Sequence, residues 1–170
     1  MTEMNKDLLA TVDLGSNSFR LLIAKVRLDG TIMPVDQIKE TVRLAGGLDA
    51  NNILKIESQQ SALAVLSRFG ERLVGFTLNQ VLVVGTSTLR VARNAEDFIA
   101  MGNKALGFNI EVISGNEEAR LIYIGAAHSL AYTLDKRLVV DIGGGSTEFI
   151  IGSGYAPQTM ESVTMGCVSF

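Results

Sequence analysis

The sequence is poor in the residues that cross-link or stack a protein. Its 170 residues include one cysteine and no tryptophan, and aromatic residues make up 6%. So few aromatic side chains argue against a platform for stacking nucleic-acid bases. The single cysteine, Cys167, cannot form an internal disulfide, and without a Cys/His cluster no structural zinc site is expected. We therefore expect a reducing, cytoplasmic environment.

Long apolar runs and basic clusters are also missing. No apolar run approaches the ~18 residues that a membrane-spanning helix needs, so no membrane span is expected. The 15 basic residues are outnumbered by 18 acidic ones, which gives a net charge of −3 without a basic block. Nucleic acid, whose binding usually rests on a basic face, is therefore not an expected partner. Hydrophobic residues make up 47% of the chain, which is enough for a packed core.

The pattern of apolar residues predicts an α/β fold. Expected strands are 8–13, 19–26, 32–43, 81–84, 110–113, 138–142 and 147–152, followed by an extended segment at 161–165. Expected helices are 56–75, 90–106 and 115–130, the first of them capped by Asn51 or Asn52. The first three strands follow one another through short turns, so they should open a mixed sheet as an antiparallel unit. Pro34 predicts an edge position or a bulge in the third strand.

A short internal echo indicates a duplicated unit. Residues 13–18 (DLGSNS) and 141–146 (DIGGGS) both close an apolar strand with Asp, pass through small residues and enter another apolar strand, 128 residues apart. Only 29 residues follow Asp141. We interpret the chain as a first domain, residues 1–125, and the start of a truncated second domain, residues 126–170. Coincidence between two short matches is the alternative.

The glycine run is the strongest candidate for a binding site. Gly143, Gly144 and Gly145 let backbone N–H groups approach an anion closely, and Ser146 adds a hydroxyl. The pattern is neither a Walker A loop nor a dinucleotide fingerprint, because it lacks G-K-[ST] and a strand follows it. It predicts a phosphate-binding hairpin turn, with a plain glycine-rich turn as the alternative.

Carboxylates near these turns are candidates for catalysis and metal binding. Asp13 and Asp141 end apolar strands and could hold Mg²⁺ or Mn²⁺ with water and phosphate oxygens, or simply accept turn N–H groups. Ser114 and Glu117 have the spacing of a capping box, which explains Glu117 structurally. Glu118 is left without such a role and is a candidate general base.

The remaining polar candidates are weaker. Arg20, Arg90 and Arg93 follow turns and could converge on an anionic substrate, although solvated arginine is the ordinary alternative. His128 lies in an apolar helical setting, where a structural role is expected. Cys167 is expected to be a small buried residue.

Five segments together resemble one protein family. Residues 13–19, 84–90, 112–120, 141–148 and 165–168 resemble, in order and spacing, the exopolyphosphatase / guanosine pentaphosphate phosphohydrolase family. This family belongs to the actin-like, sugar kinase superfamily. The resemblance implies two ribonuclease-H-like (actin-like ATPase) domains with phosphate bound between them, of which this chain would contain the first and the opening hairpin of the second.

The resemblance also implies roles for individual residues. Glu118 matches the glutamate that activates water, and Glu148 matches a second essential carboxylate. The matches to phosphate loops and substrate contacts are Asp13, Gly15, Ser16 and Asn17 in the first loop, Asp141, Gly143, Gly144 and Ser146 in the second, and Arg90 and Arg20.

The expected activity is release of terminal orthophosphate from inorganic polyphosphate, with a metal and a water activated by Glu118. Hydrolysis of guanosine pentaphosphate at its 5′-γ-phosphate is the nearest alternative. A sugar-kinase-like phosphotransferase or an actin-like nucleotide-binding module is the second. We expect the full-length protein to be a homodimer, and this 170-residue piece to fold but to be inactive.

Overall fold

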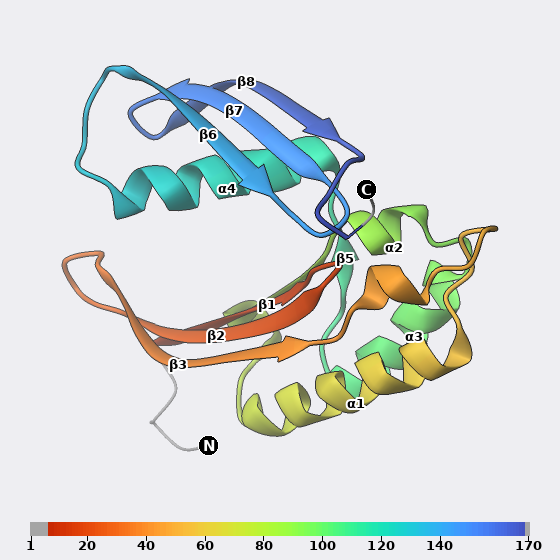
Figure 1. Cartoon of the computed structure of the whole chain (residues 1–170). Coiled ribbons are helices and arrows are strands. Elements are labelled where there is room, and N and C mark those ends of the chain that lie inside the picture. The colour runs from red at the N-terminus through yellow and green to blue at the C-terminus, as the bar shows by residue number, and fades with distance from the viewer. Residues whose placement is uncertain (1–6, 169–170) are drawn as a thin grey trace.

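The computed structural model describes residues 7–168. The chain forms two bodies, one above the other in Figure 1. The lower body contains β1 (Leu8–Leu14), β2 (Ser18–Val26), β3 (Ile32–Thr41), η2 (Leu44–Gly47), α1 (Ile56–Arg72), η3 (Leu78–Gln80), β4 (Val81–Gly85), α2 (Ser87–Val91), α3 (Ala95–Leu106) and β5 (Glu111–Val112). The upper body contains α4 (Gly115–Ser129), β6 (Lys136–Ile142), β7 (Thr147–Ser153) and β8 (Ala156–Val163).

The lower body is built on a mixed sheet in the order β3-β2-β1-β4-β5. β1, β2 and β3 are antiparallel, while β4 is parallel to β1 and β5 is parallel to β4. The antiparallel opening predicted from the sequence is therefore confirmed. Pro34 lies in the edge strand β3 and pairs with Ala24, directly after a shift in register. Both expectations for this proline are met, because an edge or a bulge needs no N–H donor from it.

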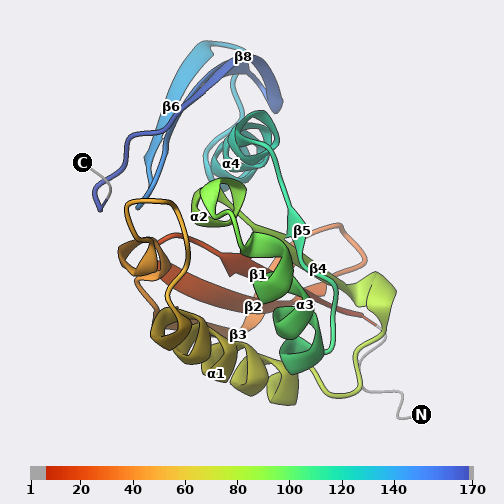
Figure 2. The ribbon, with the colours of Figure 1, turned by 90° about the vertical axis from the view of Figure 1, so that its right-hand side faces the viewer.

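Helices α1 and α3 pack together below this sheet (Figure 2). The buried residues of α1 recur at helical spacing: they are Ala62, Val65, Leu66 and Phe69. Two glycines let the helices approach closely. A Cβ at Gly70 would lie 2.8 Å from the Leu106 carbonyl oxygen, and one at Gly102 would lie 3.2 Å from Leu66 Cδ1. This close contact completes a single large core that extends to β1, β2 and β4.

The upper body is a separate three-stranded antiparallel sheet, β6-β7-β8, with α4 packed on one face. Its small core contains Ala119, Tyr123 and Ala127 from α4 and Ile150 from β7. The division of the chain at residue 125 stays a prediction. In the structure that position falls inside α4, and the buried side of the whole helix faces the second sheet.

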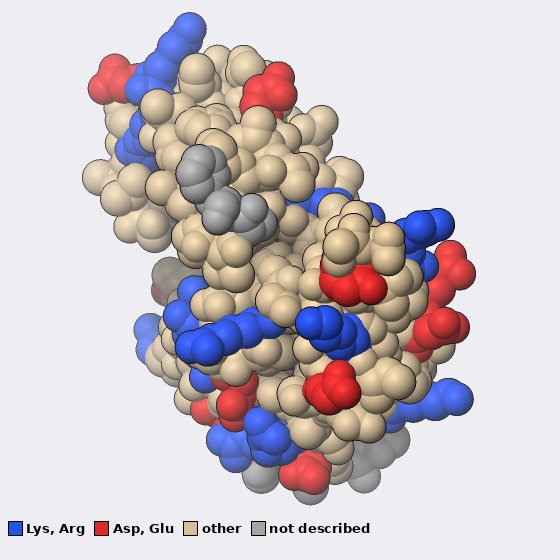
Figure 3. Space-filling view, turned by 45° about the vertical axis from the view of Figure 1, so that its right-hand side comes forward, with Lys and Arg blue, Asp and Glu red and all other residues tan. Residues whose placement is uncertain are grey.

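The opposite face of this second sheet is apolar and exposed. It presents Leu138, Val140 and Ile142 on β6, Phe149 and Ile151 on β7, and Val163 on β8. Figure 3 shows that charged side chains are sparse over the upper body and crowd the lower one. In the part of the chain that the structure describes, α4 covers only one side of the sheet.

The internal echo corresponds to two equivalent hairpins, β1-β2 and β6-β7. The matched features are the pairs Leu14–Phe19 and Ile142–Thr147 and the register shifts after Ile23 and after Ile151. Each member of the second set lies 128 residues after its counterpart in the first. Turn length, pairing and bulge are thus repeated, as expected if the second hairpin opens another unit of the same fold.

Several local expectations were wrong. The helix predicted at 90–106 is divided into α2 and α3, because the Asn94 side chain bonds both the N–H and the carbonyl of Leu54 and holds the chain out of helix. α1 is preceded by Lys55, with no side-chain cap, and Asn52 instead occupies a left-handed turn position at φ 59°. Cys167, which was expected to be buried, is exposed.

Two glycine substitutions in the upper body should have opposite effects. At Gly152 a methyl group would meet the Tyr123 ring and lie 2.5 Å from the Ala156 carbonyl oxygen, so Gly152→Ala should lower the free energy of unfolding by roughly 1 to 3 kcal/mol. At Gly125, on the exposed side of α4, a Cβ meets nothing within 4 Å. Gly125→Ala should therefore raise stability by up to about 1 kcal/mol, through helix propensity. Urea unfolding of both variants checks the pair, and equal effects would contradict this packing.

Candidate active site

A cleft of about 300 Å³ lies where the turns of the two equivalent hairpins meet. It is lined by Asp13, Gly15, Ser16, Asn17, Ser18, Arg20, Lys39, Thr86, Ser87, Glu118, Asp141, Ile142, Gly143, Gly144, Gly145, Ser146 and Cys167. The structure thus brings most of the predicted site residues together. Arg90 and Glu148 are absent from the lining and lie behind it.

The two turns touch through small groups. A Cβ at Gly144 would lie 3.2 Å from both the backbone nitrogen of Asn17 and the Cβ of Ser16. A Cβ at Gly145 would lie 2.8 Å from the hydroxyl oxygens of Ser16 and Ser87. A side chain at either position would have to displace these neighbouring atoms, so close approach favours glycine here.

The carbonyl groups of both turns are held by neighbouring segments. The Asn17 carbonyl accepts hydrogen bonds from the N–H groups of Val42 and Arg43, at 3.0 and 2.8 Å. The Gly143 and Gly144 carbonyls accept from Cys167 and Val168, at 2.9 and 3.0 Å. These hydrogen bonds hold each turn in place and pair its carbonyl groups with neighbouring N–H groups.

The N–H groups of the same turns remain available. Within residues 7–168, the backbone N–H groups of Ser16, Asn17, Gly144 and Gly145 donate to no protein acceptor. All four residues line the cleft. Successive unpaired N–H groups in tight turns form anion-binding concavities, so the two turns can clamp a phosphate group from both sides.

One row of charged residues crosses the lower sheet beside the cleft. Asp13 pairs in register with Arg20, and Arg20 pairs with Lys39. Burial raises the pKa of Asp13; Arg20 opposes this shift, and the charge of Asp141 adds to it. Arg20 and Lys39 therefore place two positive charges next to the two turns that can bind phosphate. Arg20 was expected from the sequence, whereas Lys39 was missed, since only its register with Arg20 reveals it.

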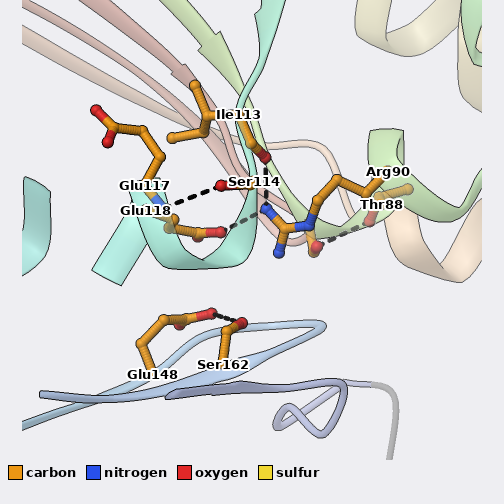
Figure 4. Close-up of polar contacts among 9 residues, drawn as sticks. Thr88, Arg90, Ile113, Ser114, Glu117, Glu118, Glu148 and Ser162 are labelled. Atoms are coloured by element: carbon orange, nitrogen blue, oxygen red, sulfur yellow. Dashed lines mark hydrogen bonds and ion pairs between the residues drawn. The ribbon is translucent and has the colours of Figure 1, made fainter. Parts of the chain in front are cut away.

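Glu118 lies in the first turn of α4 with its carboxylate paired to Arg90. Arg90 Nη1 donates to Glu118 Oε2 at 2.7 Å and to the carbonyl of Ile113 at 3.1 Å (Figure 4). The Glu118 side chain is 16% exposed. Burial raises the pKa of Glu118; Arg90 opposes the shift, and the charges of Glu148 and Asp13 reinforce it. A carboxylate that is held in place and has a raised pKa is well suited to proton transfer.

Glu148 is fully buried behind the cleft. Its Oε1 accepts a hydrogen bond from the Ser162 hydroxyl at 2.8 Å, and its Oε2 has no partner among the described residues. In register it lies opposite Asp141, the aspartate that closes β6. Glu118, Glu148, Asp13 and Asp141 therefore form one electrostatically coupled group of acids.

Two of these acids could hold a metal ion together with oxygens of the substrate. Within residues 7–168, no three His, Cys, Asp or Glu side chains lie close enough together to hold a metal ion. Asp13 and Asp141 nevertheless face the same cleft. Mg²⁺ commonly takes one or two carboxylates and completes its shell with water and substrate phosphates, so this donor set fits Mg²⁺ or Mn²⁺.

Some predicted groups lie elsewhere. Arg93 is exposed and does not line the cleft. His128 is exposed and stacks on Tyr155, with ring centroids 3.9 Å apart, outside the lining of the cleft. The capping box forms only in part: Ser114 Oγ accepts from the Glu117 N–H, but the Glu117 carboxylate turns to Arg120. Arg120, a charged partner three residues further along the helix, explains this difference.

The coupled acids predict a dependence of stability on pH. Because the pKa of Glu118 is raised above its ordinary 4.5, native protein loses stability as pH rises from about that value through the raised pKa. Glu118→Gln lacks this loss, so its stability relative to wild type should improve as pH rises. Glu117 is the control. Arg120 lowers its pKa, so the stability of Glu117→Gln relative to wild type should fall as pH rises. Urea unfolding across pH 3 to 8 checks both, because the Glu117 effect develops below about 4.5 and the Glu118 effect above it; the same sign for the two variants would contradict the electrostatics.

Relatives of known sequence match almost the whole chain. A guanosine-5′-triphosphate,3′-diphosphate pyrophosphatase of Vibrio cholerae is 47% identical over 167 residues, which cover 98% of this chain and 33% of the relative. A protein of the same name from Aliivibrio fischeri is 48% identical over 161 residues, which cover 95% of this chain and 32% of the relative. The chain therefore spans about a third of the length of these relatives.

Solved structures show the same fold. An exopolyphosphatase from Cytophaga hutchinsonii superposes with a TM-score of 0.86 at 30% identity, over 95% of this chain and 52% of the other. The Aquifex aeolicus PPX-GPPA enzyme superposes with a TM-score of 0.81 at 31% identity, over 94% of this chain and 52% of the other. The ethanolamine utilization protein EutJ from Carboxydothermus hydrogenoformans, at 14% identity and a TM-score of 0.52, shares the fold alone.

Together these matches show an actin-like, ribonuclease-H-like fold, as the sequence predicted. Among the described residues, no helix is both long and apolar enough to cross a membrane. The profile of the Ppx/GppA phosphatase family matches residues 22–170. With the phosphate-type turns and the acids described above, the chain belongs to the Ppx/GppA phosphatase family.

Proposed function

We propose that the full-length protein hydrolyses the terminal 5′-phosphoanhydride bond of guanosine pentaphosphate and releases orthophosphate. The observation that carries the proposal is the position of Glu118 in a cleft clamped by two phosphate-type turns. The names of the relatives at 47% and 48% identity support this substrate. They favour guanosine pentaphosphate, the alternative substrate that the sequence suggested, over polyphosphate as the main substrate.

Polyphosphate remains the second candidate substrate. The exopolyphosphatase from Cytophaga hutchinsonii shares the fold at 30% identity. The turns contact phosphate through backbone N–H groups, which do not distinguish a nucleotide-linked phosphate chain from a free one.

In the proposed mechanism the turns bind and orient the terminal phosphate. N–H groups of Ser16, Asn17, Gly144 and Gly145 hold its oxygens, and Arg20 and Lys39 contact the rest of the phosphate chain. Glu118 takes a proton from water as the water oxygen bonds to the terminal phosphorus. The bond from phosphorus to the bridging oxygen breaks, and its electrons stay with the shortened nucleotide. Positioning and charge stabilisation carry most of the rate in such transfers.

Arg90 and the metal have supporting roles in this proposal. The short Arg90 contact keeps Glu118 ionised and aimed, which a general base requires. Asp13 and Asp141 would hold Mg²⁺ or Mn²⁺, which when bound would neutralise negative charge on the phosphate oxygens. The homodimer and the cytoplasmic location expected from the sequence remain part of the proposal.

The substrate is tested by orthophosphate release from the full-length protein. We expect faster release from guanosine pentaphosphate than from polyphosphate or ATP, and loss of activity with excess chelator that Mg²⁺ restores. Faster release from polyphosphate would replace the substrate with the second candidate. Phosphate transfer only in the presence of a sugar or another acceptor would instead support a phosphotransferase.

Two neighbouring glutamates separate catalysis from structure. Glu118→Gln removes the base and keeps the side-chain shape, so kcat should fall roughly 10²- to 10⁴-fold. Glu117→Gln changes only an exposed pair with Arg120 and should have little effect on stability or on rate. Steady-state kinetics and unfolding of both variants check this contrast. Equal kinetic losses at the two positions would show that water is activated elsewhere.

A further inference from the structure

Ser162 reaches the buried acid Glu148 from the neighbouring strand. The two residues face each other in register across β7 and β8, and the Ser162 hydroxyl donates to Glu148 Oε1 at 2.8 Å. Figure 4 shows both side chains rising from the second sheet on the side of Glu118 and Arg90. Ser162 is thus the one hydrogen-bond partner of this carboxylate among the described residues.

Gly115 makes room for this hydroxyl at the start of α4. A Cβ at Gly115 would lie 2.5 Å from Ser162 Oγ and 2.6 Å from Ser162 Cβ. Gly115 has an ordinary helical conformation, since its φ is not among the positive values. Helix propensity alone would favour alanine at this position, so the glycine is explained by the close approach of Ser162 and not by its backbone angle.

The contact ties the two acids of the site together. Glu118 lies three residues after Gly115 in the first turn of the same helix, while Glu148 lies on the sheet beneath it. Moving Ser162 would therefore change both the direction of the Glu148 carboxylate and the seating of the turn that carries Glu118. A buried carboxylate that loses its only donor is expected to turn toward another polar group, since an unpaired buried polar group is strongly disfavoured.

We propose that Ser162 is a positioning residue that orients the Glu148 carboxylate beside Glu118, and that residue 115 is glycine to admit its hydroxyl. The inference rests on the proposed function, because Glu148 is taken to act in the same hydrolysis. Ser162 itself is absent from the lining of the main cleft. It acts through Glu148, whose free Oε2 is the atom left to contact water or a phosphate-bound cation.

Kinetics of the full-length protein test the positioning role. Ser162→Ala should lower kcat roughly 10- to 100-fold, the range expected for one hydrogen bond to a buried charge, and leave KM within about twofold. Ser162→Thr keeps a hydroxyl and should recover most of the rate. Thr164→Ala is the matched control, because Thr164 lines the same neighbouring cavity of about 320 Å³ as Ser162 but donates to no carboxylate. Its kcat should stay within about twofold of wild type.

A double-mutant cycle tests the role of Gly115. Gly115→Ala should reproduce the kcat loss of Ser162→Ala, because the added methyl displaces the hydroxyl. The Gly115→Ala/Ser162→Ala variant should lose much less than the product of the two single losses, since both changes remove the same hydrogen bond, although the Cβ of residue 162 still meets the added methyl. Independent losses that multiply in the double variant would overturn the link between these residues.

A crystal structure of Ser162→Ala gives a readout that does not depend on turnover. We expect the Glu148 carboxylate to leave its position in the wild-type protein. An unmoved Glu148, or a kcat of Ser162→Ala within twofold of wild type, would overturn the positioning role. Absence of orthophosphate release by wild-type protein would instead overturn the proposed function, and the carboxylate position would then decide the role of Ser162 alone.

Discussion

The contact between two glycine-containing turns is the constraint on which the site depends. Gly144 and Gly145 approach Ser16, Asn17 and Ser87 so closely that a side chain on either glycine would have to displace its neighbours. The approach brings two sets of unpaired N–H groups onto one cleft. Because both turns close equivalent hairpins with the same pairing and the same bulge, a repeated structural unit supplies both walls of the cleft where we propose that phosphate binds.

The same approach gathers acids that destabilise the folded chain at neutral pH. Burial raises the pKa of both Asp13 and Glu118, and their neighbours Asp141 and Glu148 add to these shifts. Only part of this unfavourable charge is offset: Arg20 opposes the pKa shift of Asp13, and Arg90 opposes that of Glu118. Packing of the core does not require such clustering, but the proposed hydrolysis with a substrate-bound cation would use it. The arrangement is typical of sites where stability is reduced in favour of reactivity.

Much of this architecture could be predicted from local patterns. Strands, turns and the equivalent hairpins follow from apolar periodicity and the DLGSNS and DIGGGS segments. What the sequence could not give were contacts set by register and close approach. Lys39 beside Arg20, Ser162 on Glu148 and the need for glycine at 115 appear only once strands are paired. The exposure of Cys167 could not be predicted, because the burial of a residue in a turn depends on what covers it.

The most direct test of the account is the position of bound phosphate. A crystal structure of full-length Glu118→Gln protein with guanosine pentaphosphate and Mg²⁺ should place the terminal 5′-phosphate between the two turns. Its oxygens should lie within hydrogen-bond distance of backbone nitrogens of both Ser16–Asn17 and Gly144–Gly145, with a water between the phosphorus and residue 118. A terminal phosphate bound outside this cleft, or held by one turn only, would contradict the central claim.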